Sequence, residues 1–109
     1  FGANKGLEDE RDLSKVGLDI ELFKAFSEGF LKACGNSLNK REIELLPMAA
    51  VVMTYECGIR FLGDYIAGDK YFKISRENHN LDRARTQMKL ISDMESNMDK
   101  MKKVVEKYI

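Results

Sequence analysis

One acidic and one basic residue stand a single helical turn apart in a stretch whose other residues are mostly apolar. Glu56 and Arg60 are separated by four positions in the run TYECGIRFLGDYIAGDKYFKI, which spans residues 54–74. On a helix, the acid-before-base order at this spacing favours an ion pair. One interpretation is a surface pair that contributes a few tenths of a kcal/mol. The other is a partly buried Arg60, held by Glu56 and ready to bind a polar ligand through its directed donors.

A second candidate binding group follows the end of the same predicted helix. Tyr71 comes just after Gly68 and Asp69, in a loop, and loops commonly carry binding groups. Its ring and hydroxyl can stack on a small polar ligand and hydrogen-bond to it, although a tyrosine at this place can also anchor the loop to the core. Asp64 and Asp69 flank the turn, but two isolated carboxylates are weak evidence for a metal site.

His79 is the single histidine of the chain. A catalytic histidine needs a nucleophile or a carboxylate partner, and the sequence identifies neither, so we expect a residue at a helix entry that is hydrogen-bonded to backbone. Glycine-rich phosphate loops and the catalytic-base loop of kinases are absent. The Cys- or Ser-x-Pro-x-Arg motif of sulfatases is absent too, since the one proline lies in Leu46-Pro47-Met48. The sequence therefore predicts no catalytic residue and no metal ligand in this chain.

Composition narrows the classes of partner. The 109 residues are enough for one small domain, and 18 basic residues balance 18 acidic ones. A net charge of zero predicts no general attraction to nucleic acid or to an anionic membrane. No apolar run approaches the roughly 20 residues of a membrane span, and no signal peptide is visible. We expect a cytoplasmic protein in which Cys34 and Cys57 are buried free thiols.

Apolar residues recur every three or four positions from residue 19 onward, which predicts an all-α fold of about three helices. The first helix spans about 19–34, with Asp19 as its N-cap and Gly35 as its C-terminal stop. Residues 1–18 have no periodic apolar face and are predicted to form an irregular lead-in. The chain thus divides into this lead-in and a helical subdomain, 19–109.

The second predicted helix opens at Asn39, with Glu42 as its capping-box partner. Pro47 interrupts the pattern, so we expect a kink there, or a short helix that abuts a longer one. Residues 48–66 are apolar or small at nearly every turn. This pattern predicts a central helix with partners on more than one side.

The third predicted helix is long and runs from about 80 to 108, with Asn80 or Asn78 as its cap. Its apolar stripe steps by three or four: Leu81, Ala84, Met88, Ile91, Met94, Met98, Met101, Val105 and Tyr108. The methionines can form a groove for a partner, but the pattern favours a core seam.

Four short motifs in a fixed order carry a resemblance to a known family. They are Glu44-Leu45-Leu46-Pro47, Met53-Thr54-x-Glu56-x-x-x-Arg60-Phe61-Leu62-x-Asp64-Tyr65, Gly68-Asp69-x-Tyr71-Phe72 and His79-Asn80-Leu81-Asp82-Arg83-x-Arg85. Together they resemble the C-terminal end of bacterial phosphotransferases related to aminoglycoside and choline kinases, most closely the branch that contains N-acetylhexosamine 1-kinases. The resemblance covers essentially the whole chain. Its first residues, Phe1 to Asn4, resemble the stretch that follows the family's Asp-rich core motif, so we expect a piece of a longer protein.

The resemblance implies that the parent protein transfers the γ-phosphoryl group of ATP to the anomeric hydroxyl of an N-acetylhexosamine. It places the catalytic base and the Mg-ATP ligands upstream, so this segment is expected to bind no cofactor while the parent uses ATP and magnesium. Arg60 and Tyr71 correspond to the positions that hold the sugar, and Glu56 orients Arg60. Some relatives are labelled mucin desulfatases, a label that the missing sulfatase motif does not support.

An alternative hypothesis belongs to another class of protein. The chain is then a stand-alone helical interaction module, whose binding surface is the methionine-lined stripe of the third predicted helix. The sequence gives neither the identity of the sugar nor the oligomeric state.

Overall fold

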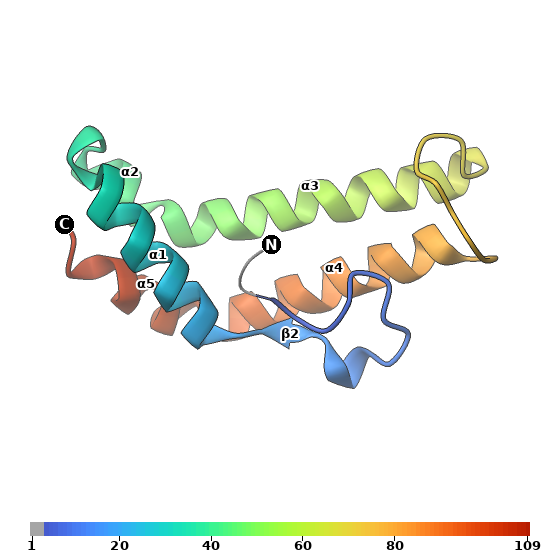
Figure 1. Ribbon diagram of the computed structural model, residues 1–109, viewed down its shortest axis with the longest axis horizontal. Helices are drawn as coiled ribbons and strands as arrows, with labels where there is room; N and C mark the ends of the chain where they lie inside the picture. Colours follow the sequence, from blue (N-terminus) through green and yellow to red (C-terminus); the bar gives the residue numbers. More distant parts are fainter. Residues whose placement is uncertain (1–3) are drawn as a thin grey trace.

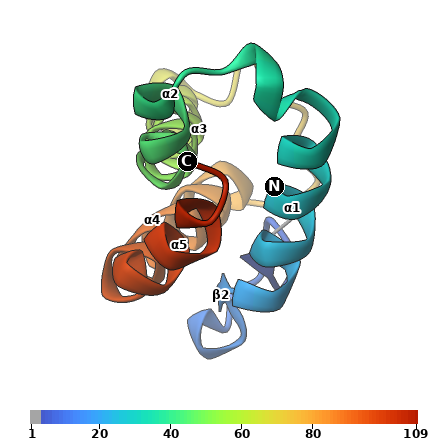
Figure 2. The same cartoon turned by 90° about the vertical axis from the view of Figure 1, so that its left-hand side faces the viewer.

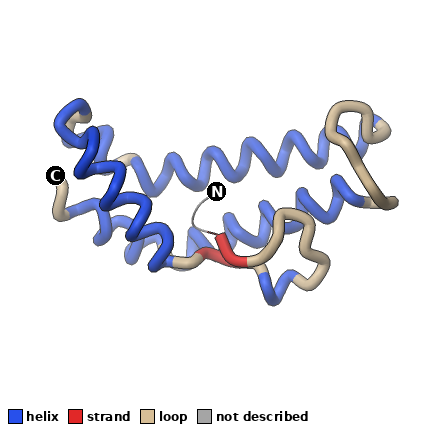
Figure 3. The backbone as a smooth tube through the Cα atoms, viewed as in Figure 1, coloured by secondary structure: helices blue, strands red, loops and turns tan. Residues whose placement is uncertain are grey.

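The computed structural model describes residues 4–109 and is built almost entirely from helices, which confirms the all-α prediction (Figures 1 and 3). In chain order the helices are α1 (Ile20–Cys34), α2 (Lys40–Glu44), α3 (Leu46–Ala67), α4 (His79–Ser96) and α5 (Met98–Glu106). Two single-turn 3₁₀ helices, η1 (Leu13–Lys15) and η2 (Gly35–Ser37), and two short antiparallel strands, β1 (Asn4–Lys5) and β2 (Gly17–Leu18), complete the described part.

The long helices α3 and α4 lie side by side and run in opposite directions, joined by the loop 68–78 (Figure 1). Helix α5 continues from α4, and α1 packs against α5. Figure 2 shows that α1 and β2 both lie on one side of the layer formed by α3, α4 and α5. The opposite side of this layer is therefore not covered by any other element of residues 4–109.

The caps predicted for the first two helices are present, but the cap predicted for the third is not: Asn78 precedes α4 without a side-chain cap hydrogen bond, and Asn80 lies within α4. The Asp19 carboxylate accepts hydrogen bonds from two backbone N–H groups of the first turn of α1. Asn39 accepts from the backbone N–H of Glu42 at 2.8 Å and donates to the Glu42 carboxylate at 3.0 Å, which closes the capping box. Gly68 ends α3 in the left-handed conformation, with φ of +98°, where a residue with a Cβ is strained.

Pro47 separates two helices rather than kinking one. Helix α2 ends at Glu44, Leu45 forms the junction, and Pro47 lies in the first turn of α3, where its missing N–H costs nothing. This is the second of the two outcomes expected from the sequence.

The third predicted helix is divided at Asn97. The side chain of Asn97 donates to the carbonyl of Asp93 at 2.8 Å and so competes with the regular backbone ladder. The backbone there has φ of −113° and ψ of 15°, which is not helical. Two helices, α4 and α5, therefore replace the single helix over 80–108.

The lead-in is more ordered than the sequence predicts. Val16, Gly17 and Leu18 are buried against α4, where the Asp93 carboxylate accepts from the Leu18 N–H and Lys89 donates to the Val16 carbonyl. These are backbone contacts, which leave no periodic trace in the sequence. Of the segment Phe1 to Asn4 that carries part of the family resemblance, residues 1–3 lie outside the described residues.

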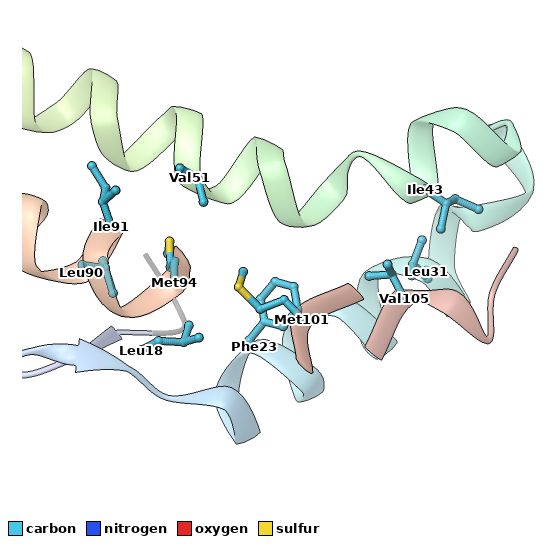
Figure 4. Close-up of a cluster of buried hydrophobic side chains, with 10 residues drawn as sticks. All are labelled: Leu18, Phe23, Leu31, Ile43, Val51, Leu90, Ile91, Met94, Met101 and Val105. Atoms are coloured by element: carbon cyan, nitrogen blue, oxygen red, sulfur yellow. The ribbon is translucent and has the colours of Figure 1, made fainter. Parts of the chain in front are cut away.

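The hydrophobic core lies where α1, α3, α4 and α5 meet (Figure 4). Its buried members are Leu18, Phe23, Leu31, Ile43, Val51, Leu90, Ile91, Met94, Met101 and Val105. Met94 and Met101 of the predicted methionine stripe belong to it, as the core-seam interpretation requires. No helix within residues 4–109 is long and apolar enough to span a membrane.

The prediction that α3 is surrounded on more than one side is wrong for the middle and C-terminal part of the helix. Its buried residues there, Thr54, Gly58 and Phe61, face α4. A row of apolar residues on another face of α3 is largely exposed. The periodicity of apolar residues shows that α3 has two apolar faces, but it does not show which of them packs against another helix.

Candidate functional site

The structure brings the three predicted site residues together near the C-terminal end of α3. The Arg60 guanidinium carbon lies 5.7 Å from the centre of the Tyr71 ring and 5.6 Å from that of Phe72. Glu56 forms an ion pair with Arg60, with 3.6 Å between a carboxylate oxygen and a guanidinium nitrogen. Both rings are within the range in which a cation is attracted to an aromatic face. Sequence reasoning predicted the Glu56–Arg60 pair and the place of Tyr71, but not the contribution of Phe72.

Arg60 is less buried than one of the two sequence interpretations supposed. The side chains of Arg60 and Glu56 are 50% and 51% exposed, so the pair lies at the surface and contributes little to stability. The apolar neighbour Ile59 is itself exposed, which is why the pair is not enclosed. Tyr71 is 74% exposed and therefore does not anchor the loop to the core. The Arg60 guanidinium and the Tyr71 hydroxyl are therefore both accessible to a ligand.

Asp64 fixes the loop that carries Tyr71. Its carboxylate accepts hydrogen bonds from three successive backbone N–H groups, at 3.0 Å from Lys70, 2.8 Å from Tyr71 and 3.0 Å from Phe72. Burial raises the pKa of Asp64, but the hydrogen bonds from these N–H groups and from the side-chain amide of Asn80 lower it by more. The pKa of Asp64 is therefore below its usual value. Asp64 is thus a structural acceptor for the loop.

Asn80 joins the two ends of this loop. It is fully buried, and its side-chain amide donates to Asp64 at 2.8 Å and to Asp69 at 3.0 Å. Its carbonyl oxygen accepts from Arg83 at 2.9 Å, and Arg83 also donates to the backbone carbonyl of Lys73. Sequence reasoning missed this network. The sequence does contain a sign of this network: the first turn of α4 is mostly polar, whereas the first turn of an ordinary amphipathic helix carries apolar residues on its buried face.

Phe72 is the apolar support of the site. Its ring lies 4.8 Å from that of Phe61 on α3 and 4.9 Å from that of Tyr71, in tilted and edge-on arrangements. The Arg83 guanidinium covers the Phe61 ring at 5.7 Å. The aromatic pair therefore links the exposed tyrosine to the interface between α3 and α4.

His79 occupies a helix entry and is hydrogen-bonded to backbone, as expected from the sequence. Its Nδ1 accepts from the backbone N–H of Ser75 at 3.1 Å, so its proton is on Nε2, which donates to the Asp9 carboxylate at 2.8 Å. This bond lowers the pKa of Asp9; burial opposes the effect, and the charge of Arg76 adds to it. His79 thus ties the N-terminal segment to the start of α4.

A separate cavity of about 530 Å³ lies between α1, α3 and α4. Its wall is mostly apolar, and Phe26, Phe30 and Met53 are among its lining residues, whereas Arg60 and Tyr71 are not. The predicted site and this cavity are therefore different places.

Within residues 4–109, the side chains of His, Cys, Asp and Glu form no group of three or more that could hold a metal ion. Asp64 and Asp69, the weak candidates, share the Asn80 amide instead. Cys34 and Cys57 are both free, as predicted, but each is only partly buried. A comparison with protein families finds no family model that matches this chain.

Proposed function

We propose that this chain is the acceptor-binding helical subdomain of an ATP-dependent small-molecule kinase, and that the parent protein phosphorylates an N-acetylhexosamine at its anomeric hydroxyl. The ordered motifs of residues 44–85 support the kinase class through their resemblance to that family. The observation that carries the site is the position of the Arg60 guanidinium beside the exposed ring of Tyr71, at 5.7 Å.

The chemistry of these two side chains suits a sugar. A planar guanidinium offers several directed donors to ring hydroxyls or to the carbonyl of an acetamido group. An exposed aromatic ring can pack against the C–H face of a pyranose while its hydroxyl hydrogen-bonds at the edge. Glu56 limits the orientations of Arg60, and Asp64 holds the backbone of Tyr71 in place.

Phosphoryl transfer depends mainly on positioning and on stabilisation of charge. In the proposed parent, the catalytic base and the Mg-ATP ligands belong to residues outside this chain. The role of Arg60 and Tyr71 is then to hold the acceptor hydroxyl in line with the phosphoryl group.

Steady-state kinetics of the full-length parent test this assignment. Replacing Arg60 by Ala removes a hydrogen bond from a charged donor, so we expect kcat/KM for the sugar to fall roughly 10- to 100-fold, with KM for ATP unchanged. Arg41→Ala is the matched control, because Arg41 is also exposed and pairs with a glutamate one turn away, but in α2. Unchanged acceptor KM and kcat in Arg60→Ala would refute the assignment.

A further inference from the structure

The uncovered side of the α3–α4 layer carries a regular row of apolar side chains. On α3 they are Met48, Val52, Tyr55, Ile59, Leu62 and Ile66, with exposed fractions between 39% and 76%. Six large side chains exposed to this degree present on the order of 500 Å², near the upper end for patches on monomers. An exposed apolar patch of this size is often an interaction surface.

The spacing of this row is that of a coiled-coil seam. The steps from Met48 to Ile66 alternate four and three without a break, so the row follows the heptad positions a and d. Position a holds the β-branched residues Val52, Ile59 and Ile66, and position d holds the unbranched or γ-branched Met48, Tyr55 and Leu62. The row contains no charged residue that would exclude an apolar partner.

The surface of α3 also has a hollow that can receive a side chain of a facing helix, as in the knobs-into-holes packing of coiled coils. A hollow of about 380 Å³ is lined by residues of α3 that include Val52, Tyr55, Glu56 and Ile59. These four stand at i, i+3, i+4 and i+7, the arrangement that receives one side chain of a facing helix.

The row is complementary to itself when a second copy runs antiparallel. With a two-fold axis at the level of Cys57, each d residue faces an a residue of the other copy. The facing pairs are Met48 with Ile66, Val52 with Leu62, and Tyr55 with Ile59. A β-branched side chain therefore meets a different, non-β-branched one at every level.

The same axis also pairs opposite charges on α4. The contacts of Gly58 with Met88 and of Thr54 with Met94 place Cys57 at about the level of residue 90 of α4. On that helix Arg85, Met88, Ser92 and Glu95 follow each other at steps of three and four, and all are exposed. An axis at residue 90 brings Arg85 of one copy opposite Glu95 of the other, twice.

We propose that this face binds a second copy of the chain, so that two antiparallel α3–α4 pairs form a four-helix arrangement with two-fold symmetry. The apolar seam drives the association, and the two Arg85–Glu95 pairs fix its direction. Arg60 is at heptad position b, outside the apolar row, but it lines the same hollow, so the dimer interface reaches the edge of the candidate sugar site. The inference is independent of the proposed function.

Sedimentation equilibrium of the 109-residue chain tests the dimer. The wild-type chain dimerises with rising concentration, whereas Ile59→Lys is monomeric and keeps its helical circular dichroism, because Ile59 is exposed. Met53→Lys is the matched control: Met53 is also on α3 and about as exposed, but it lines the cavity on the other side. A wild-type chain that stays monomeric at millimolar concentration overturns the proposal, as does a dimer that Met53→Lys disrupts and Ile59→Lys does not.

Charge reversal tests the predicted pairing. Arg85→Glu and Glu95→Arg each place like charges opposite one another at two sites, so each raises the dissociation constant by roughly tenfold. The double variant Arg85→Glu/Glu95→Arg restores the opposite pairs and returns the constant to near the wild-type value. Additive weakening in the double variant would exclude the antiparallel two-fold arrangement.

Discussion

At the scale of single residues, the carboxylate of Asp64 determines where Tyr71 lies. It accepts three backbone N–H groups of the loop, and it does so best when ionised. The position of the candidate sugar-binding tyrosine is therefore coupled to the charge of a residue that need not contact the sugar.

This coupling predicts a dependence of the loop on pH. The pKa of Asp64 is lowered in the folded state from an ordinary value of 3.8. Because the folded pKa is the lower one, the stabilisation is complete above the ordinary value and is lost as the pH falls through the folded value. Amide hydrogen exchange and chemical shifts of Tyr71 and Phe72 are thus expected to be constant from neutral pH down to about 4 and to change below it. A transition of these amides near neutral pH would contradict this role, and Asp64→Asn should lack the acid transition altogether.

Part of the site could be predicted at this scale. The four-residue spacing indicated the Glu56–Arg60 pair, and the glycine turn indicated that Tyr71 lies in a loop. The degree of burial of Arg60 could not be predicted, because it depends on which face of α3 meets α4. The bonds of Asp64 to the loop and to Asn80 depend on a chain reversal that no local pattern specifies.

At the scale of elements, the ends of the helices follow from local chemistry. Asp19 and Asn39 cap their helices as their types predict, and Gly68 ends α3 because it adopts a positive φ at no steric cost. The break at Asn97 was not predicted, because asparagine is tolerated within helices. The hydrogen bond from its side chain to the Asp93 carbonyl, which competes with the backbone hydrogen bonds of the helix, is visible in the structure alone.

Two glycines of the same region provide a matched pair of variants. Gly68→Ala forces a Cβ into the left-handed conformation and should lower the free energy of unfolding by roughly 1–2 kcal/mol. Gly63→Ala lies on the exposed face of α3, where an added Cβ meets no atom within 4 Å, and should raise it by roughly 0.5–1 kcal/mol. Urea denaturation measures both. Equal effects of the same sign would show that the turn at Gly68 does not control the end of α3.

At the scale of the whole molecule, polar contacts fasten the N-terminal segment to α4. His79 is buried and connects the loop at Ser75 with Asp9, and Thr86 donates to the carbonyl of Glu8. These contacts join residues far apart in the sequence, so a charge-rich segment that the sequence presents as irregular becomes part of the fold.

Removing His79 should loosen this attachment. His79→Ala leaves the Ser75 N–H without its acceptor and the Asp9 carboxylate with Arg76 as its remaining side-chain partner, and we expect the free energy of unfolding to fall by roughly 1–3 kcal/mol. Hydrogen exchange should accelerate at the N–H groups of Val16 and Leu18 before it does in α3. Unchanged protection of these two amides would mean that the segment is held without His79.

If Arg60 and Tyr71 bind an amino sugar, an NMR titration of the chain with N-acetylglucosamine or N-acetylgalactosamine detects the binding at both residues. We predict saturable shift changes for the Arg60 side-chain N–H and for the ring of Tyr71. Arg41 should not respond, and the response should be lost in Arg60→Ala. The absence of any change at millimolar sugar, or changes confined to the cavity residues Phe26, Phe30 and Met53, would show that Arg60 and Tyr71 do not bind the sugar.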